Sequence, residues 1–328
     1  MASIASEAIR ISPLAQKLSS HAGAVVALIG PTSLEVIPLG SNITGDTPME
    51  IGSLTKPFTA LLLAEAIRRN ELQPNTRIDE LLFDEQWPGD PITVEHLATH
   101  TSGLPRLSMS LWTIMLHPLD PYRGYTRDYL LGYLRRRKPS VPAQVKAVYS
   151  NLGFAVLGLA LEKASSQNYQ HLLQGRLLDP MKMRASGLHL SGQPDLCERG
   201  HRASGRATPV WHFDAYAPCG AMVSTLTDLV GAARAFLDGT NPITDSLSLT
   251  LQPRATLLKN SVGLGWMIPD KDWFWHNGAT FGYTSYLGIN PLQGAGVAIL
   301  CNQFLPKQAT ELGHQLMRSI ASRATEKL

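Results

Sequence analysis

Cysteine is scarce in this chain of 328 residues, which contains only Cys197, Cys219 and Cys301. The three lie far apart in the sequence, and none of them forms a Cys-x-x-Cys pair or a zinc-ligand spacing. This scarcity excludes a cysteine-based zinc site. We expect reduced, partly buried thiols, which favour a reducing compartment, and we expect the protein to bind no metal and no cofactor.

Strong charge of one sign and long apolar runs are also absent. The chain has 29 Lys and Arg against 26 Asp and Glu, a net charge of +3, which is too small to indicate binding to nucleic acid or to a membrane surface. No apolar run reaches the length of a membrane-spanning helix, and residues 1–17 lack the basic and apolar regions of a signal peptide. We therefore expect a cytoplasmic protein whose partner is a small molecule, in an oligomeric state that the sequence does not indicate.

Motifs of several enzyme classes are missing. The sequence contains no P-loop, no dinucleotide-binding fingerprint and no Gly-x-Ser-x-Gly elbow. His96 and His100 are four residues apart, but Leu97 stands where a His-Glu-x-x-His zinc site needs its glutamate. We interpret His100 as a histidine that hydrogen-bonds nearby backbone rather than as a catalytic group.

The chain does contain a serine and a lysine one helical turn apart, Ser53 and Lys56, in its only Ser-x-x-Lys. Apolar residues then recur at helical spacing over 58–66, and Pro57 disfavours a much earlier helix start. We predict a distorted turn around Ser53 and regular helix from about Lys56. A serine needs a base to become a nucleophile, and a neutral lysine one turn away can supply it. The pattern alone also fits a helix N-cap followed by a solvated lysine. The choice between these two interpretations depends on whether the chain contains further motifs that would complete an active site.

Two further patterns supply such partners. Tyr149 and Asn151 form the only Tyr-x-Asn, at the start of a predicted helix over 154–164. A tyrosine there can relay protons, and an asparagine offers a substrate amide both a donor and an acceptor. The stretch 276–279, with His276 and Gly278, ends a predicted strand. A glycine lets a substrate lie along the strand edge, and backbone N–H groups can bind an oxyanion.

The distribution of strand and helix patterns predicts an α/β fold of the α+β sandwich type. Two apolar runs, 24–29 and 34–39, form a hairpin, and strand-like runs return near the C-terminus at 263–268, 273–276, 283–290 and 296–302. Residues 58–180 are predicted to be mostly helical. We predict an antiparallel sheet flanked by terminal helices, at 5–20 and 306–324, and packed against an inserted all-helical lobe.

The predicted domain division follows from this pattern. Residues 1–57 and 216–328 form the sheet lobe, and residues 58–215 form the mostly helical lobe, which includes a helix at 107–117. The active site is expected at their interface. Residues 186–215 show little periodicity and are predicted to be a long surface excursion that borders the site.

The three motifs, in this order, resemble the signature motifs of the serine β-lactamase-like and penicillin-binding-protein-like family. The resemblance is closest to its branch of class C β-lactamases, esterases and D-aminopeptidases. It extends from about residue 20 to 305 and includes the stretches 97–104, 178–183, 219–228 and 263–266.

The resemblance implies the β-lactamase/transpeptidase-like fold and a role for each motif. Ser53 becomes acylated, with Lys56 and Tyr149 as general base and acid. Backbone N–H groups of Ser53 and Ala279 form the oxyanion hole. The residues implied in substrate binding are Asn151, His276, Asn277 and Gly278.

One departure from the family bears on the substrate. The β-lactamases of the family usually have Lys-Thr-Gly where this chain has His276, Asn277 and Gly278, and a neutral histidine holds a substrate carboxylate less well than lysine. We predict a serine hydrolase that acts on an ester or amide of a small acyl substrate. The alternatives are acyl transfer to an alcohol or amine in a natural-product pathway, weak β-lactamase activity, and, ranked last, a non-catalytic ligand-binding module.

Overall fold

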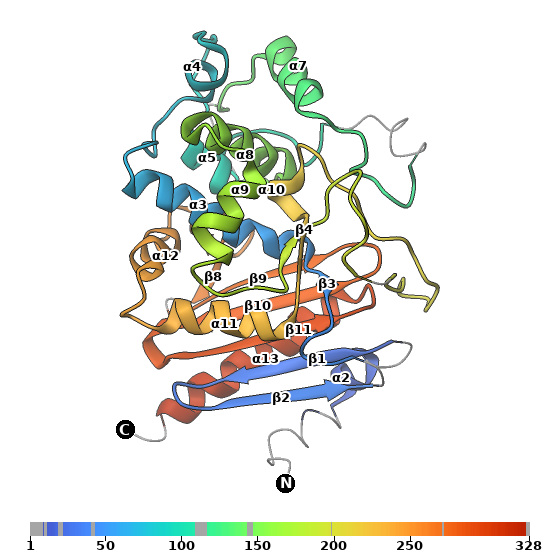
Figure 1. The fold of residues 1–328 in the computed structure, drawn as a ribbon. Helices are drawn as coiled ribbons and strands as arrows, with labels where there is room; N and C mark the ends of the chain where they lie inside the picture. Colours follow the sequence, from blue (N-terminus) through green and yellow to red (C-terminus); the bar gives the residue numbers. More distant parts are fainter. Residues whose placement is uncertain are drawn as a thin grey trace.

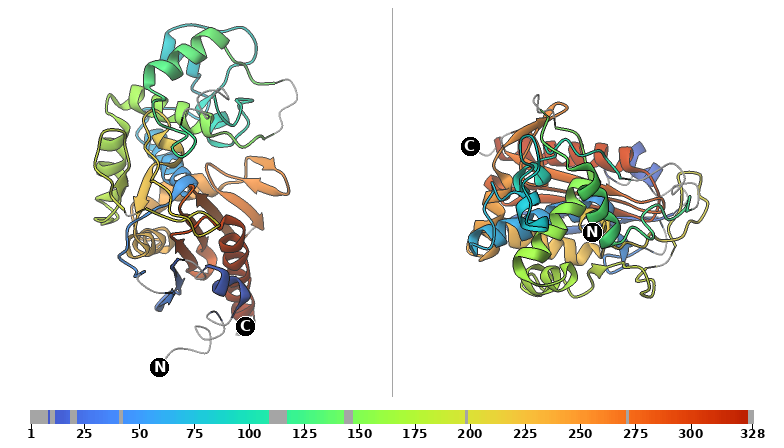
Figure 2. Two further views of the ribbon diagram at one scale, coloured as in Figure 1. Left: turned by 90° about the vertical axis from the view of Figure 1, so that its right-hand side faces the viewer. Right: turned by 90° about the horizontal axis from the view of Figure 1, so that it is seen from above.

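The computed structural model describes residues 9, 12–18, 22–40, 43–108, 117–142, 147–197, 199–270 and 272–325. A large sheet occupies one end of the molecule and a group of helices the other, with both termini at the sheet end (Figure 1). Figure 2 shows the same arrangement from the side, with the edge strands of the sheet projecting beside the helices. The predicted helix at 107–117 lies mostly outside the described residues.

The large sheet is antiparallel and has eight strands in the order β2-β1-β11-β10-β9-β8-β7-β6. The predicted hairpin and the predicted strands at 273–276, 283–290 and 296–302 are confirmed. The predicted strand at 263–268 is wrong over most of its length, because residues 263–266 form a bend and strand β8 begins only at Met267. Strands β6 and β7 extend the sheet beyond the prediction. The strands are β1 Ala24–Ile29, β2 Leu34–Leu39, β6 Ala255–Leu257, β7 Asn260–Val262, β8 Met267–Asp270, β9 Trp273–Ala279, β10 Thr284–Asn290 and β11 Ala295–Cys301. Strand β1 pairs with β11, so an N-terminal and a C-terminal strand lie side by side in the sheet.

Side chains alternate between the two faces of this sheet, as strand geometry requires. On β11, Val297 and Ile299 belong to a core shared with the terminal helices, α2 Pro13–Leu18 and α13 Pro306–Thr325. Ala298 and Leu300 belong to a second core on the opposite face, which α11, Leu226–Leu237, covers. The sheet flanked by terminal helices is therefore confirmed.

Helices occupy most of the chain between the N-terminal and C-terminal strands. They are α3 Thr55–Arg68, α4 Ile78–Phe83, α5 Val94–Ala98, α7 Arg127–Arg137, α8 Asn151–Ser165, α9 Tyr169–Leu173 with a π-helical turn at Gln174–Leu178, and α10 Ala217–Gly220. The longest, α8, is buried along most of its length and packs against α3, α5 and α10. A later helix, α12 Ile243–Leu251, packs on α3 and was not predicted. We retain the division into lobes 1–57 with 216–328, and 58–215, as a proposal.

A second, three-stranded sheet connects the two groups. Its order is β3-β5-β4, with β3 at Met49–Glu50, β5 at Met222–Ser224 and β4 at Gly187–Leu188. Glu50 pairs with Val223, and the chain passes from Glu50 directly toward α3. This small sheet therefore holds the segment that leads into Ser53.

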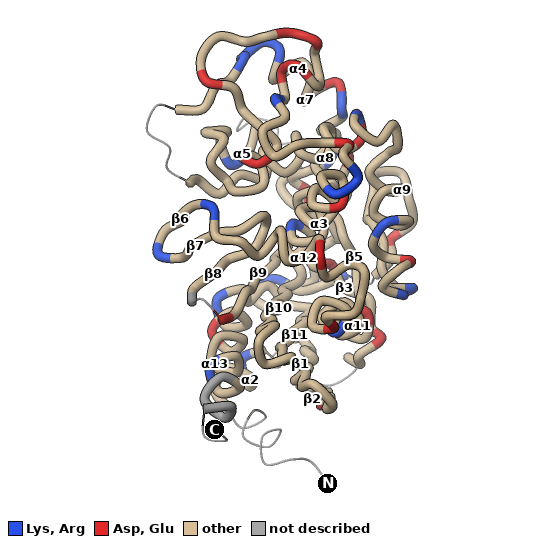
Figure 3. The backbone as a smooth tube through the Cα atoms, turned by 90° about the vertical axis from the view of Figure 1, so that its left-hand side faces the viewer, with Lys and Arg blue, Asp and Glu red and all other residues tan. Residues whose placement is uncertain are grey.

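Charged residues are intermixed on the surface. Figure 3 shows both acidic and basic positions along α13 and around α4 and α7. Among the described residues, no helix combines the length and the apolar character that crossing a membrane requires.

Candidate active site

Ser53 lies in a single 3-10 turn, Gly52–Leu54, which leads directly into α3. This is the distorted turn and later helix start that the sequence predicted. Gly52 has a φ of +50°, and a Cβ on it would lie 2.8 Å from the backbone N of Ala279 on β9. A side chain at position 52 would therefore push the turn off the strand. The glycine allows the backbone beside Ser53 to rest directly on β9.

Lys56 points back at Ser53 from the first turn of α3. Its side chain is fully buried, with Nζ 3.1 Å from Ser53 Oγ and 2.7 Å from the carbonyl oxygen of Cys219. Nζ also lies 4.9 Å from the centre of the Tyr149 ring. Among the described residues, no carboxylate forms an ion pair with Lys56. Its Nζ lies within hydrogen-bond reach of the Ser53 hydroxyl, which is the position that a general base for this serine would occupy.

Tyr149 and His100 form the wall of the site next to Lys56. Their ring centres are 4.5 Å apart, and His100 Nδ1 accepts a hydrogen bond of 3.1 Å from the backbone N–H of Ser150. Burial, with a smaller contribution from nearby Lys56, holds the pKa of His100 well below its ordinary value. His100 is thus a neutral support for the segment that carries Tyr149, and its interpretation as a backbone-bonding histidine is confirmed.

Asn151 begins α8, where Ser150 caps the helix by accepting from the N–H of Gly153 at 2.9 Å. The Asn151 Nδ2 group donates to the hydroxyl of Tyr122 at 2.7 Å. Its Oδ1 is buried and has no hydrogen-bond partner among the described residues. The amide is therefore held by one end and presents a free acceptor at the other, as a contact to a substrate N–H requires.

His276 lies on β9 with its ring 6.2 Å from that of Tyr149. Its Nδ1 is 2.5 Å from the carbonyl oxygen of Asn277, so we assign the proton to Nδ1 and leave Nε2 as a bare acceptor. Nε2 is buried and has no partner among the described residues. Burial and the nearby charge of Lys56 lower the pKa of His276 to about 3. The third motif thus supplies a neutral ring rather than a positive charge.

Gly278 allows β9 to lie directly against the backbone of Ile51, two residues before Ser53. A Cβ on Gly278 would lie 1.8 Å from the carbonyl oxygen of Ile51, and Ser285 on β10 donates to that same oxygen at 2.7 Å. These contacts bring the backbone of Ala279 beside the turn that holds Ser53. The pairing of their N–H groups into an oxyanion hole remains a prediction.

The side chain of Asn277 faces away from the site. Its Nδ2 donates to Thr310 Oγ1 at 2.8 Å, and Thr310 belongs to α13 on the opposite face of the sheet. Successive residues of a strand point to opposite faces, so His276 and Gly278 face the site and Asn277 faces away. A part of Asn277 in substrate binding therefore stays a prediction that concerns its backbone.

The sequence analysis missed an aromatic wall next to Asn151. Tyr122 stacks on Phe213 with ring centres 4.8 Å apart and lies 5.3 Å from the ring of Trp211. Trp211 and Phe213 come from the predicted excursion 186–215, so its expected position beside the site agrees with these contacts. No motif marks Tyr122, because its partner Asn151 is 29 residues away.

Comparisons with known proteins agree with this geometry. A model of the β-lactamase family matches residues 15–322. A β-lactamase of Escherichia coli (strain K12) is 24% identical over 312 residues, which cover 81% of this chain and 78% of that protein. The D-alanyl-D-alanine-carboxypeptidase/endopeptidase AmpH of the same strain is 26% identical over 281 residues, which cover 78% and 71%. A solved class C β-lactamase from Rhodobacter sphaeroides has a similar fold, with a TM-score of 0.82 at 20% identity over 97% of this chain and 100% of that one.

Proposed function

Because the chain belongs to the β-lactamase family, we propose that it is a serine hydrolase that cleaves an ester or amide of a small acyl substrate through an acyl-Ser53 intermediate. The observation that carries the proposal is the contact of 3.1 Å between Ser53 Oγ and the buried Nζ of Lys56. A nucleophile within hydrogen-bond reach of a base that lacks a counter-charge is the arrangement that acyl transfer needs.

In the proposed mechanism, Lys56 takes the proton of the Ser53 hydroxyl as Oγ attacks the substrate carbonyl carbon. The backbone N–H groups of Ser53 and Ala279 stabilise the resulting oxyanion. The tetrahedral intermediate collapses, the bond to the leaving alcohol or amine breaks, and Tyr149 delivers a proton to that group. Water then attacks the acyl-Ser53 ester by the same steps in reverse, releasing the acid and restoring the serine.

The neutral third motif narrows the proposed substrate class. His276 carries no charge near neutral pH, since burial lowers its pKa to about 3, so it offers a substrate carboxylate no positive partner. The free Oδ1 of Asn151 accepts a hydrogen bond from an amide N–H of the acyl part. We therefore propose neutral esters and amides as preferred substrates, with β-lactams cleaved weakly at most. The three described cysteines are free and buried, which supports our proposal of a cytoplasmic location.

The test combines a short-chain p-nitrophenyl ester, a fluorophosphonate probe and intact mass. Wild-type protein is expected to turn over the ester and to gain one probe adduct, located at Ser53. Ser53→Ala should lose both, whereas Ser248→Ala, a change of an exposed serine on α12, should keep both. Adding an alcohol or amine and analysing the products then separates hydrolysis from acyl transfer. Absence of turnover and adduct in the wild type would overturn the proposal in favour of a ligand-binding module.

A further inference from the structure

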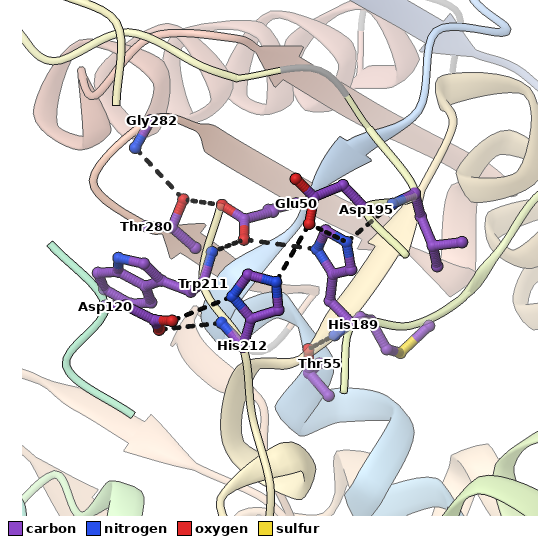
Figure 4. A network of polar contacts seen from close by, with 11 residues as sticks. Glu50, Thr55, Asp120, His189, Asp195, Trp211, His212, Thr280 and Gly282 are labelled. Carbon is purple, nitrogen blue, oxygen red and sulfur yellow. Dashed lines mark hydrogen bonds and ion pairs between the residues drawn. The ribbon is translucent and has the colours of Figure 1, made fainter. Parts of the chain in front are cut away.

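Glu50, three residues before Ser53, is a buried carboxylate that the mechanism above does not use. Only 3% of its surface is exposed. Oε2 accepts a hydrogen bond from the hydroxyl of Thr280, and Oε1 accepts one from the backbone N–H of Trp211, each at 2.6 Å. Figure 4 shows the carboxylate between these two groups. One side chain thus binds segments that lie 161 and 230 residues away in the sequence.

The first of these contacts reaches the strand that borders Ser53. Thr280 directly follows Ala279, the last residue of β9, and begins the turn into β10. Its backbone N–H donates to the carbonyl oxygen of Tyr283 at 3.1 Å, and its hydroxyl oxygen also accepts from the N–H of Gly282 at 3.4 Å. The hydroxyl therefore links this turn to Glu50. The link lies one residue after Ala279, whose backbone N–H is proposed for the oxyanion hole.

The second contact reaches the aromatic wall. The ring of Trp211 packs edge-on against Phe281 of the same turn, with ring centres 4.8 Å apart, and lies 5.3 Å from the ring of Tyr122. Tyr122 in turn holds the amide of Asn151. Glu50 consequently binds both the turn after β9 and the segment that supports the proposed substrate-binding asparagine.

A histidine lies on a third side of the carboxylate. His189, which follows β4, is buried, and its Nε2 accepts from the N–H of Leu196 at 2.8 Å. Its Nδ1 lies 3.9 Å from Glu50 Oε1, beyond hydrogen-bond distance. Within the described residues, these histidine and carboxylate groups are not arranged to hold a metal ion. The network is a set of hydrogen bonds, and its centre is Glu50.

We propose that Glu50 is a positioning residue of the active site. Its carboxylate holds the end of β9, and with it the N–H of Ala279, in register with the turn that carries Ser53. The proposal rests on the acyl-enzyme function proposed above, because it assigns Glu50 the task of aligning the oxyanion donors of that reaction. An oxyanion donor must point at the position where negative charge develops, so a small displacement of the β9 end lowers the acylation rate.

The test removes the hydroxyl that Glu50 binds and leaves the shape of the turn unchanged. Thr280→Val is compared with Ser246→Ala. The control removes the hydroxyl that donates to another buried carboxylate, Glu65 on α3, which lies away from β9. Two quantities are measured: amide hydrogen exchange of residues 278–283, and the rate of Ser53 labelling by the fluorophosphonate. Thr280→Val is expected to speed exchange and slow labelling by about tenfold each, with ester kcat lowered and KM little changed. Ser246→Ala should match the wild type in both.

Glu50→Gln keeps the shape of the side chain and serves as a second variant, with smaller changes in the same direction because neutral hydrogen bonds are weaker. Wild-type exchange and labelling rates in Thr280→Val and Glu50→Gln would overturn the role of Glu50. Equal losses in Ser246→Ala would also overturn it, because a general loss of stability would then explain them. If the wild type is not labelled at Ser53, the proposed function has failed. In that case faster exchange in Thr280→Val would show only that Glu50 stabilises the turn after β9.

Discussion

The two ends of α3 bury charges of opposite sign and treat them differently. Lys56, in the first turn, is fully buried, and no carboxylate among the described residues pairs with it. Glu65, near the other end, is 8% exposed. It meets Arg68 at 3.3 Å and Arg69 at 3.4 Å, and it accepts a hydrogen bond from Ser246.

This contrast separates a charge that serves structure from one that serves chemistry. A buried charge costs free energy unless partners compensate it. The main partner of Glu65 is the buried hydroxyl of Ser246, because water screens the exposed Arg68 and Arg69. Lys56 has only a serine hydroxyl, a backbone carbonyl and aromatic rings around its Nζ. Uncompensated groups of this kind are concentrated at functional sites. Four substitutions test this contrast.

Replacing Lys56 by methionine should have the largest effect on activity. Lys56→Met removes the base while filling the same space, so the rate of Ser53 labelling is expected to fall about 10³-fold. The free energy of unfolding should equal or exceed that of the wild type, because a buried ion without a counter-charge is replaced by an apolar side chain. Urea unfolding beside the labelling assay checks both. A large loss of stability would show that the lysine is structural.

The buried histidines beside Lys56 should make the fold sensitive to acid. His276 has a pKa of about 3 in the folded chain, below the ordinary 6.5, so between these values the unfolded chain binds more protons than the folded chain. The free energy of unfolding therefore falls as the pH drops through this window, by up to about 1.4 kcal/mol per pH unit. Urea unfolding at several pH values should give a shallower slope for His276→Asn than for the wild type. An unchanged slope would contradict burial of this ring in its neutral form.

Replacing Glu65 should lower the stability and leave the activity unchanged, which is the opposite of the result expected for Lys56. Glu65→Ala leaves the hydroxyl of Ser246 without its acceptor, and we expect the free energy of unfolding to fall by about 1–2 kcal/mol. Arg68 and Arg69 contribute little, because their side chains are 43% and 54% exposed and water screens them. Ser53 labelling should stay within about twofold of the wild type, since the change lies outside the catalytic contacts. Slower Ser53 labelling at an unchanged free energy of unfolding would show that Glu65 contributes to catalysis rather than to stability.

The smallest effect on catalysis is expected at Asn277. Asn277→Ala removes the hydrogen bond to Thr310 on the far face of the sheet and should lower the free energy of unfolding by about 1 kcal/mol, with KM and kcat unchanged. Asn151→Ala, the matched change on the near face, should raise KM for an amide-containing ester about tenfold through loss of one hydrogen bond. Ester kinetics on both variants make the comparison. A raised KM in Asn277→Ala would show that this side chain takes part in substrate binding.

Patterns that are local in the sequence predicted most of the fold and the core of the site. Ser53 and Lys56 are one helical turn apart, so their contact follows from helix geometry alone. The strand and helix periods likewise placed β9, β10, β11 and α13. The side of β9 that Asn277 occupies was also within reach of prediction, because strict alternation from His276 sends it to the opposite face.

Contacts between distant segments could not be predicted in this way. The bonds from Glu50 to Trp211 and Thr280 join residues far apart in the sequence, and no local period signals either pairing. Tyr122 and Asn151 meet because the turn that carries Tyr122 lies against the start of α8, which depends on the packing of the whole helical group. The short helix α4 and the helix α12 were missed for a related reason, since burial against other elements decides such short segments.

The pairing of β1 with β11, in which Ala24 lies opposite Cys301, has a consequence for how the protein is made. Residues of the nucleophile turn leave the ribosome early, but β9 follows more than two hundred residues later, and the sheet that holds it is completed only by β11. A nascent chain therefore carries Ser53 and Lys56 through more than two hundred further residues of synthesis without β9 beside them. The proposed site is complete only after β9, β10 and β11 have been translated, and contacts of such long range slow folding.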